Sequence, residues 1–118
     1  AANSLAPFAD PVYLHQTRVL TDSGMRRYGD LPEALAENPA GDWLVHFHVP
    51  LYYPETDGIS STSYLLDRAF LDYAGRRGYH LEIETYSYSR LPGSKPDVVD
   101  SIVREYGFVM RNISREGT

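Results

Sequence analysis

Two short runs of the chain place ionisable side chains on one face of an expected strand and apolar side chains on the other. They are residues 43–50 (Trp-Leu-Val-His-Phe-His-Val-Pro) and residues 80–86 (His-Leu-Glu-Ile-Glu-Thr-Tyr). Because alternate side chains of a strand leave opposite faces, His46 and His48 share one face of the first run. Glu82 and Glu84 share one face of the second run in the same way. If the two strands are neighbours, their imidazoles and carboxylates converge, and that combination binds a divalent metal or carries out acid–base chemistry.

Turn and cap residues indicate a hairpin and a short helix before the first of these runs. Residues 12–20 are rich in β-forming residues, and the Thr-Asp-Ser-Gly turn that follows would let residues 25–28 return as a second strand. Asp30 then has the position of a helix N-cap, and Glu33 has the position from which a capping box is closed. The Asn-Pro-Ala-Gly sequence at residues 38–41 ends this helix.

Two longer amphipathic helices are expected in the second half of the chain. The first covers about residues 61–77 and ends at Gly78, and the second begins near Ser94 with Asp97 as a possible capping residue. The apolar stripe of the last helix consists of Val98, Val99, Ile102, Val103, Tyr106, Val109, Met110 and Ile113. The resulting order of strand, helix, strand, helix, strand, helix favours an α/β fold with a parallel sheet and right-handed crossover helices.

In a parallel α/β unit, functional sites lie at the carboxyl ends of the strands. His48 and Glu84 are closest to those ends, so the sequence places the site on them. His46 and Glu82 would lie one layer deeper, as partners that support the site or contact a substrate. The structural alternative is that the deeper pair is simply a polar part of the core, satisfied by each other.

Further residues near these strands are weaker candidates for the same site. His15, on the preceding strand, is a possible third contributor, although a histidine on the surface of a hairpin is the simpler interpretation. Arg90 and the helix start near Ser94 could together bind an anion, because a helix N-terminus presents free N–H groups. A solvated loop arginine is the favoured interpretation of Arg90. Four tyrosines could line the mouth of a pocket: Tyr52, Tyr53, Tyr86 and Tyr88.

The composition excludes several classes of function. The 118 residues carry a formal net charge of −5, and the basic residues are scattered, so no nucleic-acid interface is expected. The absence of cysteine excludes disulfides, thiolate zinc sites and a cysteine nucleophile. No apolar run is long enough to span a membrane and no signal peptide is recognisable, so a cytoplasmic location is expected. The chain also begins without a methionine, which suggests a piece of a longer protein.

A cupin fold is the competing interpretation of the His-x-His motif. Gly41, the two histidines and Glu55 loosely match the cupin order of Gly, His-x-His and Glu. The spacing to Glu55 is too long, however, and an amphipathic helix follows where a cupin requires another strand.

The chain resembles the C-terminal part of the Ebo-type metabolite traffic proteins over nearly its whole length. The residues that carry the resemblance are 46–50, 80–86 and Leu91-Pro92 before the closing helix, together with 13–16 and 30–35. Those proteins are similar to the sugar phosphate isomerase/epimerase, or xylose isomerase-like, superfamily of TIM barrels. The resemblance therefore implies that residues 1–118 are the C-terminal βα units of a TIM barrel, with a possible N-terminal hairpin.

The resemblance also implies roles for individual residues. The second histidine of the His-x-His motif and the glutamate that ends the last strand are metal ligands in the superfamily, which match His48 and Glu84. Glu84 would in addition be the catalytic carboxylate. The metal would be Mn²⁺, Co²⁺, Zn²⁺ or Mg²⁺, and the site would be incomplete because its other ligands lie on earlier strands. The partner of the chain would be the remainder of the barrel or another copy.

Two functions remain open at this point. One is a metal-dependent isomerase or epimerase of a small hydroxylated metabolite, in which the metal stabilises an enediolate while a carboxylate shuttles the proton. The other is a non-catalytic protein of metabolite binding and traffic that has kept the pocket and lost turnover.

Overall fold

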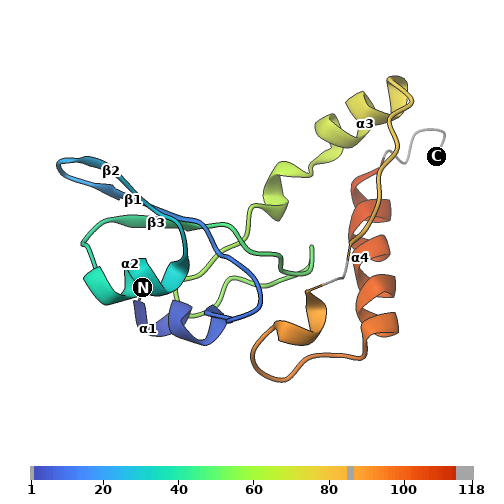
Figure 1. Cartoon of the computed structure of the whole chain (residues 1–118). Coiled ribbons are helices and arrows are strands. Elements are labelled where there is room, and N and C mark those ends of the chain that lie inside the picture. The colour runs from blue at the N-terminus through green and yellow to red at the C-terminus, as the bar shows by residue number, and fades with distance from the viewer. Residues whose placement is uncertain (1, 85–86, 114–118) are drawn as a thin grey trace. The chain divides into compact units, whose positions relative to one another are not determined.

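The computed structural model describes residues 2–84 and 87–113, which fall into two compact units. The sheet unit comprises Ala1–His48, Thr56–Ile59 and Arg90–Pro92. The helix unit comprises Val49–Glu55, Ser60–Ser89 and Gly93–Thr118. Each unit has its own core, so each is described separately (Figure 1).

The sheet unit is built on three antiparallel strands, β1 (Thr17–Thr21), β2 (Gly24–Tyr28) and β3 (Asp42–Val45). Their order is β2-β1-β3, so β1 is central and is hydrogen-bonded on both edges. The predicted hairpin is confirmed, since β1 and β2 pair from Thr17 opposite Tyr28 to Thr21 opposite Gly24. β3 returns along the other edge of β1, with Val19 opposite Trp43.

One face of this sheet is covered and the other is open. Val19 and Thr17 point to the covered face and are almost completely buried. Two helical segments lie on that side (Figure 1): α1 (Ala2–Leu5), continued by the 3₁₀ turn η1 (Ala6–Phe8), and α2 (Leu31–Glu37). Their buried residues Leu5, Phe8, Leu31 and Ala34 complete the core. The alternation of buried and exposed residues in β1 is therefore the expected pattern of a sheet covered on one side.

Asp30 joins the start of α2 to the segment before β1. Its Oδ1 accepts a hydrogen bond from the N–H of Leu31 at 2.8 Å, as predicted for an N-cap, and another from the N–H of His15 at 3.0 Å. Glu33 completes the cap by accepting the N–H of Gly29 at 3.2 Å. The helix ends at Asn38, which has the left-handed conformation (φ 48°) that asparagine tolerates at a C-cap. A single carboxylate thus fixes two segments that are 15 residues apart.

The helix unit contains α3 (Arg68–Arg76) and α4 (Val98–Asn112), with short 3₁₀ turns η2 (Ser63–Leu65) and η3 (Tyr88–Arg90) on the connecting segments. α3 begins later than predicted, because Asp67 is its N-cap and accepts the N–H of Phe70 at 2.9 Å. α4 likewise begins at Asp97, whose carboxylate accepts the N–H of Val99 at 3.1 Å. Both starts are set by an aspartate cap rather than by the first residue of an apolar stripe.

The face that α4 buries is polar. Ser101 and Glu105, one turn apart, are 0% and 4% exposed. By contrast, the residues of the predicted apolar stripe with the largest exposed fractions are Val99, Val103, Tyr106 and Met110, at 56–63%. The last helix was predicted correctly, but the side chains that it buries most deeply are polar and lie outside its apolar stripe.

The predicted α/β fold of TIM-barrel type is wrong. The expected parallel partner of residues 43–49 was the strand at residues 80–86, but β3 pairs antiparallel with β1 instead. Residues 80–84 form no strand, and Thr85 and Tyr86 lie outside the described residues. The physical reason is that the hairpin supplies a strand edge close in sequence, whose pairing needs no crossover helix. The described strands make up one three-stranded sheet, so the cupin alternative is not supported either.

Gly41 enters β3 where no side chain fits, which makes the approach of β3 to β1 testable. A Cβ at Gly41 would overlap the carbonyl oxygen of Leu20 and lie 2.9 Å from its carbonyl carbon, and the φ of +148° disfavours any L-residue. We expect Gly41→Ala to lower the free energy of unfolding by about 2–4 kcal/mol, measured by urea denaturation.

Gly29→Ala is the matched control for this substitution. Its Cβ would meet only the carboxylate oxygens of Glu33 at 3.8 Å, which is ordinary contact, so the change should stay within about 0.5 kcal/mol. Equal effects of the two substitutions would show that the close approach of the strands does not hold the sheet unit together.

Candidate functional site

The structure brings the two histidines of the His-x-His motif together on the open side of the sheet. One more backbone hydrogen bond follows the end of β3, since the N–H of His46 donates to the carbonyl oxygen of Gln16 at 2.9 Å. Both His46 and His48 are exposed. Val45, which precedes them, and Phe47, which lies between them, are partly buried. The predicted alternation of faces in this run is therefore confirmed.

The geometry of the His46–His48 pair suits a shared metal ion. The ring centroids are 5.7 Å apart and the ring planes differ by 22°. Imidazole nitrogens bind Zn²⁺ at about 2.0–2.1 Å, so two rings on one tetrahedral ion have centroids about 5 Å apart. The observed centroids are slightly farther apart than this, and the nearly parallel rings would have to reorient to bind one ion. Within residues 2–84 and 87–113, no group of three or more histidine, aspartate or glutamate side chains could hold a metal ion.

His15 cannot join this pair, because it lies on the opposite face of the sheet. It precedes Thr17 by two residues and shares the covered face with it, and its side chain is buried. The ring meets Phe47 edge-on at 5.9 Å, and Phe47 in turn stacks on Phe8 at 4.6 Å. The alternative of a surface histidine is therefore wrong, and a contribution of His15 to a site other than the His46–His48 pair stays a prediction.

Glu82 and Glu84 lie in an extended segment of the helix unit that belongs to no strand, and both are exposed. Since His48 belongs to the sheet unit, the prediction that His48 and Glu84 are ligands of one metal ion stays a prediction. The same holds for the supporting role assigned to His46 with Glu82.

The two positive groups of the predicted anion site, Arg90 and the start of α4, each have a carboxylate beside them. Arg90 lies 3.8 Å from the carboxylate of Asp10 in the sheet unit, so its charge is already partly balanced. The start of α4 is occupied by the carboxylate of Asp97. A negatively charged cap offsets the positive end of the helix dipole, so this helix start does not attract anions.

A buried polar cluster in the helix unit was not foreseen from the sequence as a site. The hydroxyl groups of Tyr52 and Ser101 are 2.7 Å apart, and Tyr88, also buried, donates its hydroxyl to the carbonyl oxygen of Pro96. Arg104 lies over the ring of Tyr52 at 5.8 Å from its centroid. The signal in the sequence was the spacing of Ser101 and Glu105 by four residues, which places both on one face of α4.

Glu105 is the buried carboxyl group of this cluster. Its Oε1 accepts the N–H of Leu51 at 3.2 Å, while its buried Oε2 has no hydrogen-bond partner within the described part of the chain. Burial raises the pKa of Glu105, and the hydrogen bond from Leu51 opposes this only in part. Burial likewise raises the pKa of the Tyr88 phenol. The cluster therefore favours neutral side chains.

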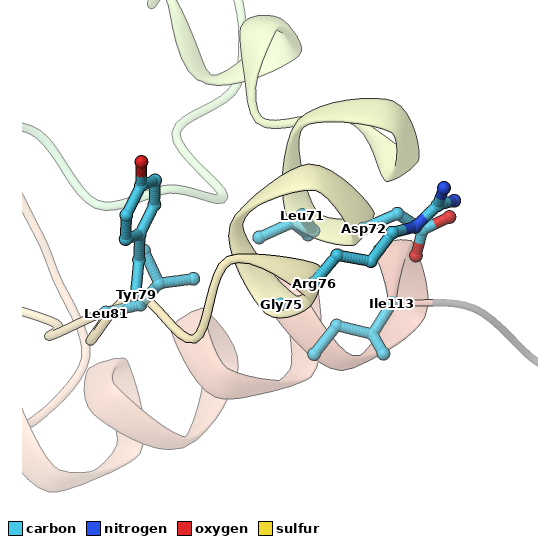
Figure 2. Close-up of a pocket in the computed structure, with 7 residues that line it drawn as sticks. All are labelled: Leu71, Asp72, Gly75, Arg76, Tyr79, Leu81 and Ile113. Atoms are coloured by element: carbon cyan, nitrogen blue, oxygen red, sulfur yellow. The ribbon is translucent and has the colours of Figure 1, made fainter.

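A mostly apolar hollow of about 370 Å³ lies between α3 and the end of α4 (Figure 2). The residues that line it are Leu71, Asp72, Gly75, Arg76, Tyr79, Leu81 and Ile113. Asp72 lies 3.6 Å from Arg68 one turn earlier on α3. None of the site residues predicted from the sequence lines this hollow.

Comparison with known proteins adds no relative. The chain matches no protein-family model, no curated protein and no solved structure. No helix among the described residues is both long and apolar enough to cross a membrane.

The buried carboxyl of Glu105 predicts a pH-dependent stability. Because its pKa is raised in the folded state, its stabilising contribution is present at acid pH and is lost as the pH rises through the folded-state pKa. Glu105→Gln keeps the acceptor for the Leu51 N–H but cannot ionise. We expect the free energy of unfolding of this variant, relative to wild type, to increase between about pH 4 and pH 7 in urea denaturation series.

Glu82→Gln, which changes an exposed carboxyl of the same unit, serves as the control for the loss of one negative charge. Parallel stability curves for wild type and Glu105→Gln over this pH range would contradict the burial of an ionisable carboxyl in the cluster.

Proposed function

We propose that this chain binds a small hydroxylated metabolite by way of a divalent metal ion held by His46 and His48. The observation that carries the proposal is the pair of exposed imidazoles, with ring centroids 5.7 Å apart, on the segment that directly follows β3. Two protein ligands leave further coordination positions for water or for hydroxyl and carbonyl oxygens of a bound molecule. Such an ion, when bound, would act as a Lewis acid toward those oxygens.

The ligand type narrows the choice of metal. Imidazole suits Zn²⁺ and Co²⁺, whereas Mg²⁺ and Mn²⁺ favour carboxylate, carbonyl and water oxygens. Of the four ions expected from the sequence, Zn²⁺ and Co²⁺ therefore fit the His46–His48 pair best.

Binding rather than turnover is the form of the proposal that the geometry supports. Isomerisation requires a carboxylate that shuttles a proton beside the metal, a role that only the sequence assigns to Glu84. The histidine pair stands on an open face that does not exclude water. A role in metabolite binding and traffic, as the resemblance to Ebo-type proteins suggests, is part of this proposal, and so is a cytoplasmic location.

Zinc binding tests the proposal directly. Wild-type chain titrated with Zn²⁺ by isothermal calorimetry should bind one ion per His46–His48 pair, and His46→Ala or His48→Ala should each weaken binding at least about tenfold. This magnitude follows because even the partners behind metal ligands are worth about 10–100-fold in affinity. Glu84→Ala in the same series tests whether Glu84 is a ligand, since a ligand should cause a loss as large as that of His48.

His80→Ala is the matched control, because His80 is exposed like His46 and His48 but is not a member of the proposed ligand pair. It should leave the affinity unchanged within about twofold. If all three histidine substitutions weaken zinc binding equally, the ion binds non-specifically and the proposal fails.

A further inference from the structure

Two arginines face each other on the open side of the sheet. Arg18 of β1 and Arg27 of β2 are directly opposite residues in the antiparallel ladder. The Cα atoms of such residues are about 5 Å apart, and their side chains leave the same face. Both residues are exposed, and neither has an ion pair within residues 2–84 and 87–113.

This arrangement costs stability as it stands. Like charges directly opposite each other on a sheet repel and destabilise the pairing. The charge of the neighbouring Arg26 is balanced, because Arg26 points to the other face and forms an ion pair with Glu37 of α2. Among the described residues, no carboxylate forms an ion pair with Arg18 or Arg27. An anion that bridges the two guanidinium groups would remove the repulsion.

The arginine pair and the histidine pair share one face of the sheet. Leu44 is directly opposite Arg18, and His46 follows Leu44 by two residues, so all three side chains point the same way. From the strand spacing and the rise per residue, the Cα atoms of Arg18 and His46 are about 8 Å apart. One small molecule can therefore reach both pairs.

We propose that Arg18 and Arg27 bind an oxyanion group, a phosphate or a carboxylate, of the molecule that the His46–His48 site takes up. This inference rests on the proposed function and gives its ligand a charge. Guanidinium groups present parallel N–H donors that match the oxygens of a phosphate or carboxylate. The anion would also neutralise two positive charges that otherwise oppose a metal ion on the same face.

Inorganic phosphate and acetate, titrated separately into metal-free chain at low ionic strength and followed by ¹H–¹⁵N NMR shifts, test the oxyanion site by itself. The anion that the site takes should bind saturably, with the largest shifts in β1 and β2. Arg18→Gln and Arg27→Gln should each weaken its binding about tenfold or more, as expected for a lost hydrogen bond between charged groups. Both variants should also melt at a higher temperature than wild type without anion, because the repulsion is gone.

Arg26→Gln is the matched control, since it removes the same charge from the adjacent residue on the opposite face. It should change the affinity by less than about twofold. Failure of both anions to bind wild-type chain, or equal losses in Arg26→Gln and Arg27→Gln, would overturn the inference.

The zinc titration separates this outcome from failure of the proposed function. Loss of phosphate or acetate binding in the arginine variants with intact zinc binding supports both proposals. Zinc binding by wild type with no binding of either anion leaves the metal site and refutes the oxyanion site. Anion binding without zinc binding refutes the proposed function and the shared ligand together.

Discussion

The sheet unit depends on a single short strand that is hydrogen-bonded on both of its edges. β1 pairs with β2, to which a tight turn connects it, on one edge and with β3 on the other edge. Both neighbours run antiparallel to β1. Because every register in the sheet is measured from β1, the faces of β2 and β3 are fixed by the face on which Val19 is buried. The carboxylate of Asp30 holds the segment before β1 against the start of α2, which covers that same face.

This constraint separates the ionisable residues of the sheet unit into two groups. His15 points to the same covered face as Thr17 and Val19, where it packs against Phe47. Four other residues alternate the opposite way and remain exposed on the open face: His46, His48, Arg18 and Arg27. A sheet covered on one side needs polar residues on the other side, but it does not need two opposed arginines or two adjacent histidines there. The functional proposals rest on that excess of positively charged and metal-binding side chains over what solubility requires.

The helix unit is organised around buried polar groups of α4. α4 turns Ser101 and Glu105 inward, and their hydrogen bonds with Tyr52 and the backbone of Leu51 offset part of the cost of burying polar groups. One oxygen of Glu105 remains without a partner among the described residues, and this raises the cost of its negative charge. A buried network of this kind favours one arrangement of the segments it joins, because any other arrangement leaves more polar groups unpaired.

Local patterns in the sequence determined the β1–β2 hairpin, helices α2, α3 and α4, and the alternation of faces at residues 43–48. The turn between β1 and β2, the caps at Asp30 and Asp97, and the alternation through His46 and His48 all depend on neighbours within a few residues. Tertiary structure decided which strands pair. The alternation at residues 43–48 is the same whether the neighbouring strand is parallel or antiparallel, and the similar pattern at residues 80–84 forms no strand at all. Tertiary structure also decided which face of α4 is buried. A helix with an apolar stripe and a polar stripe can bury its polar stripe where hydrogen-bond partners, here Tyr52 and the backbone of Leu51, are available.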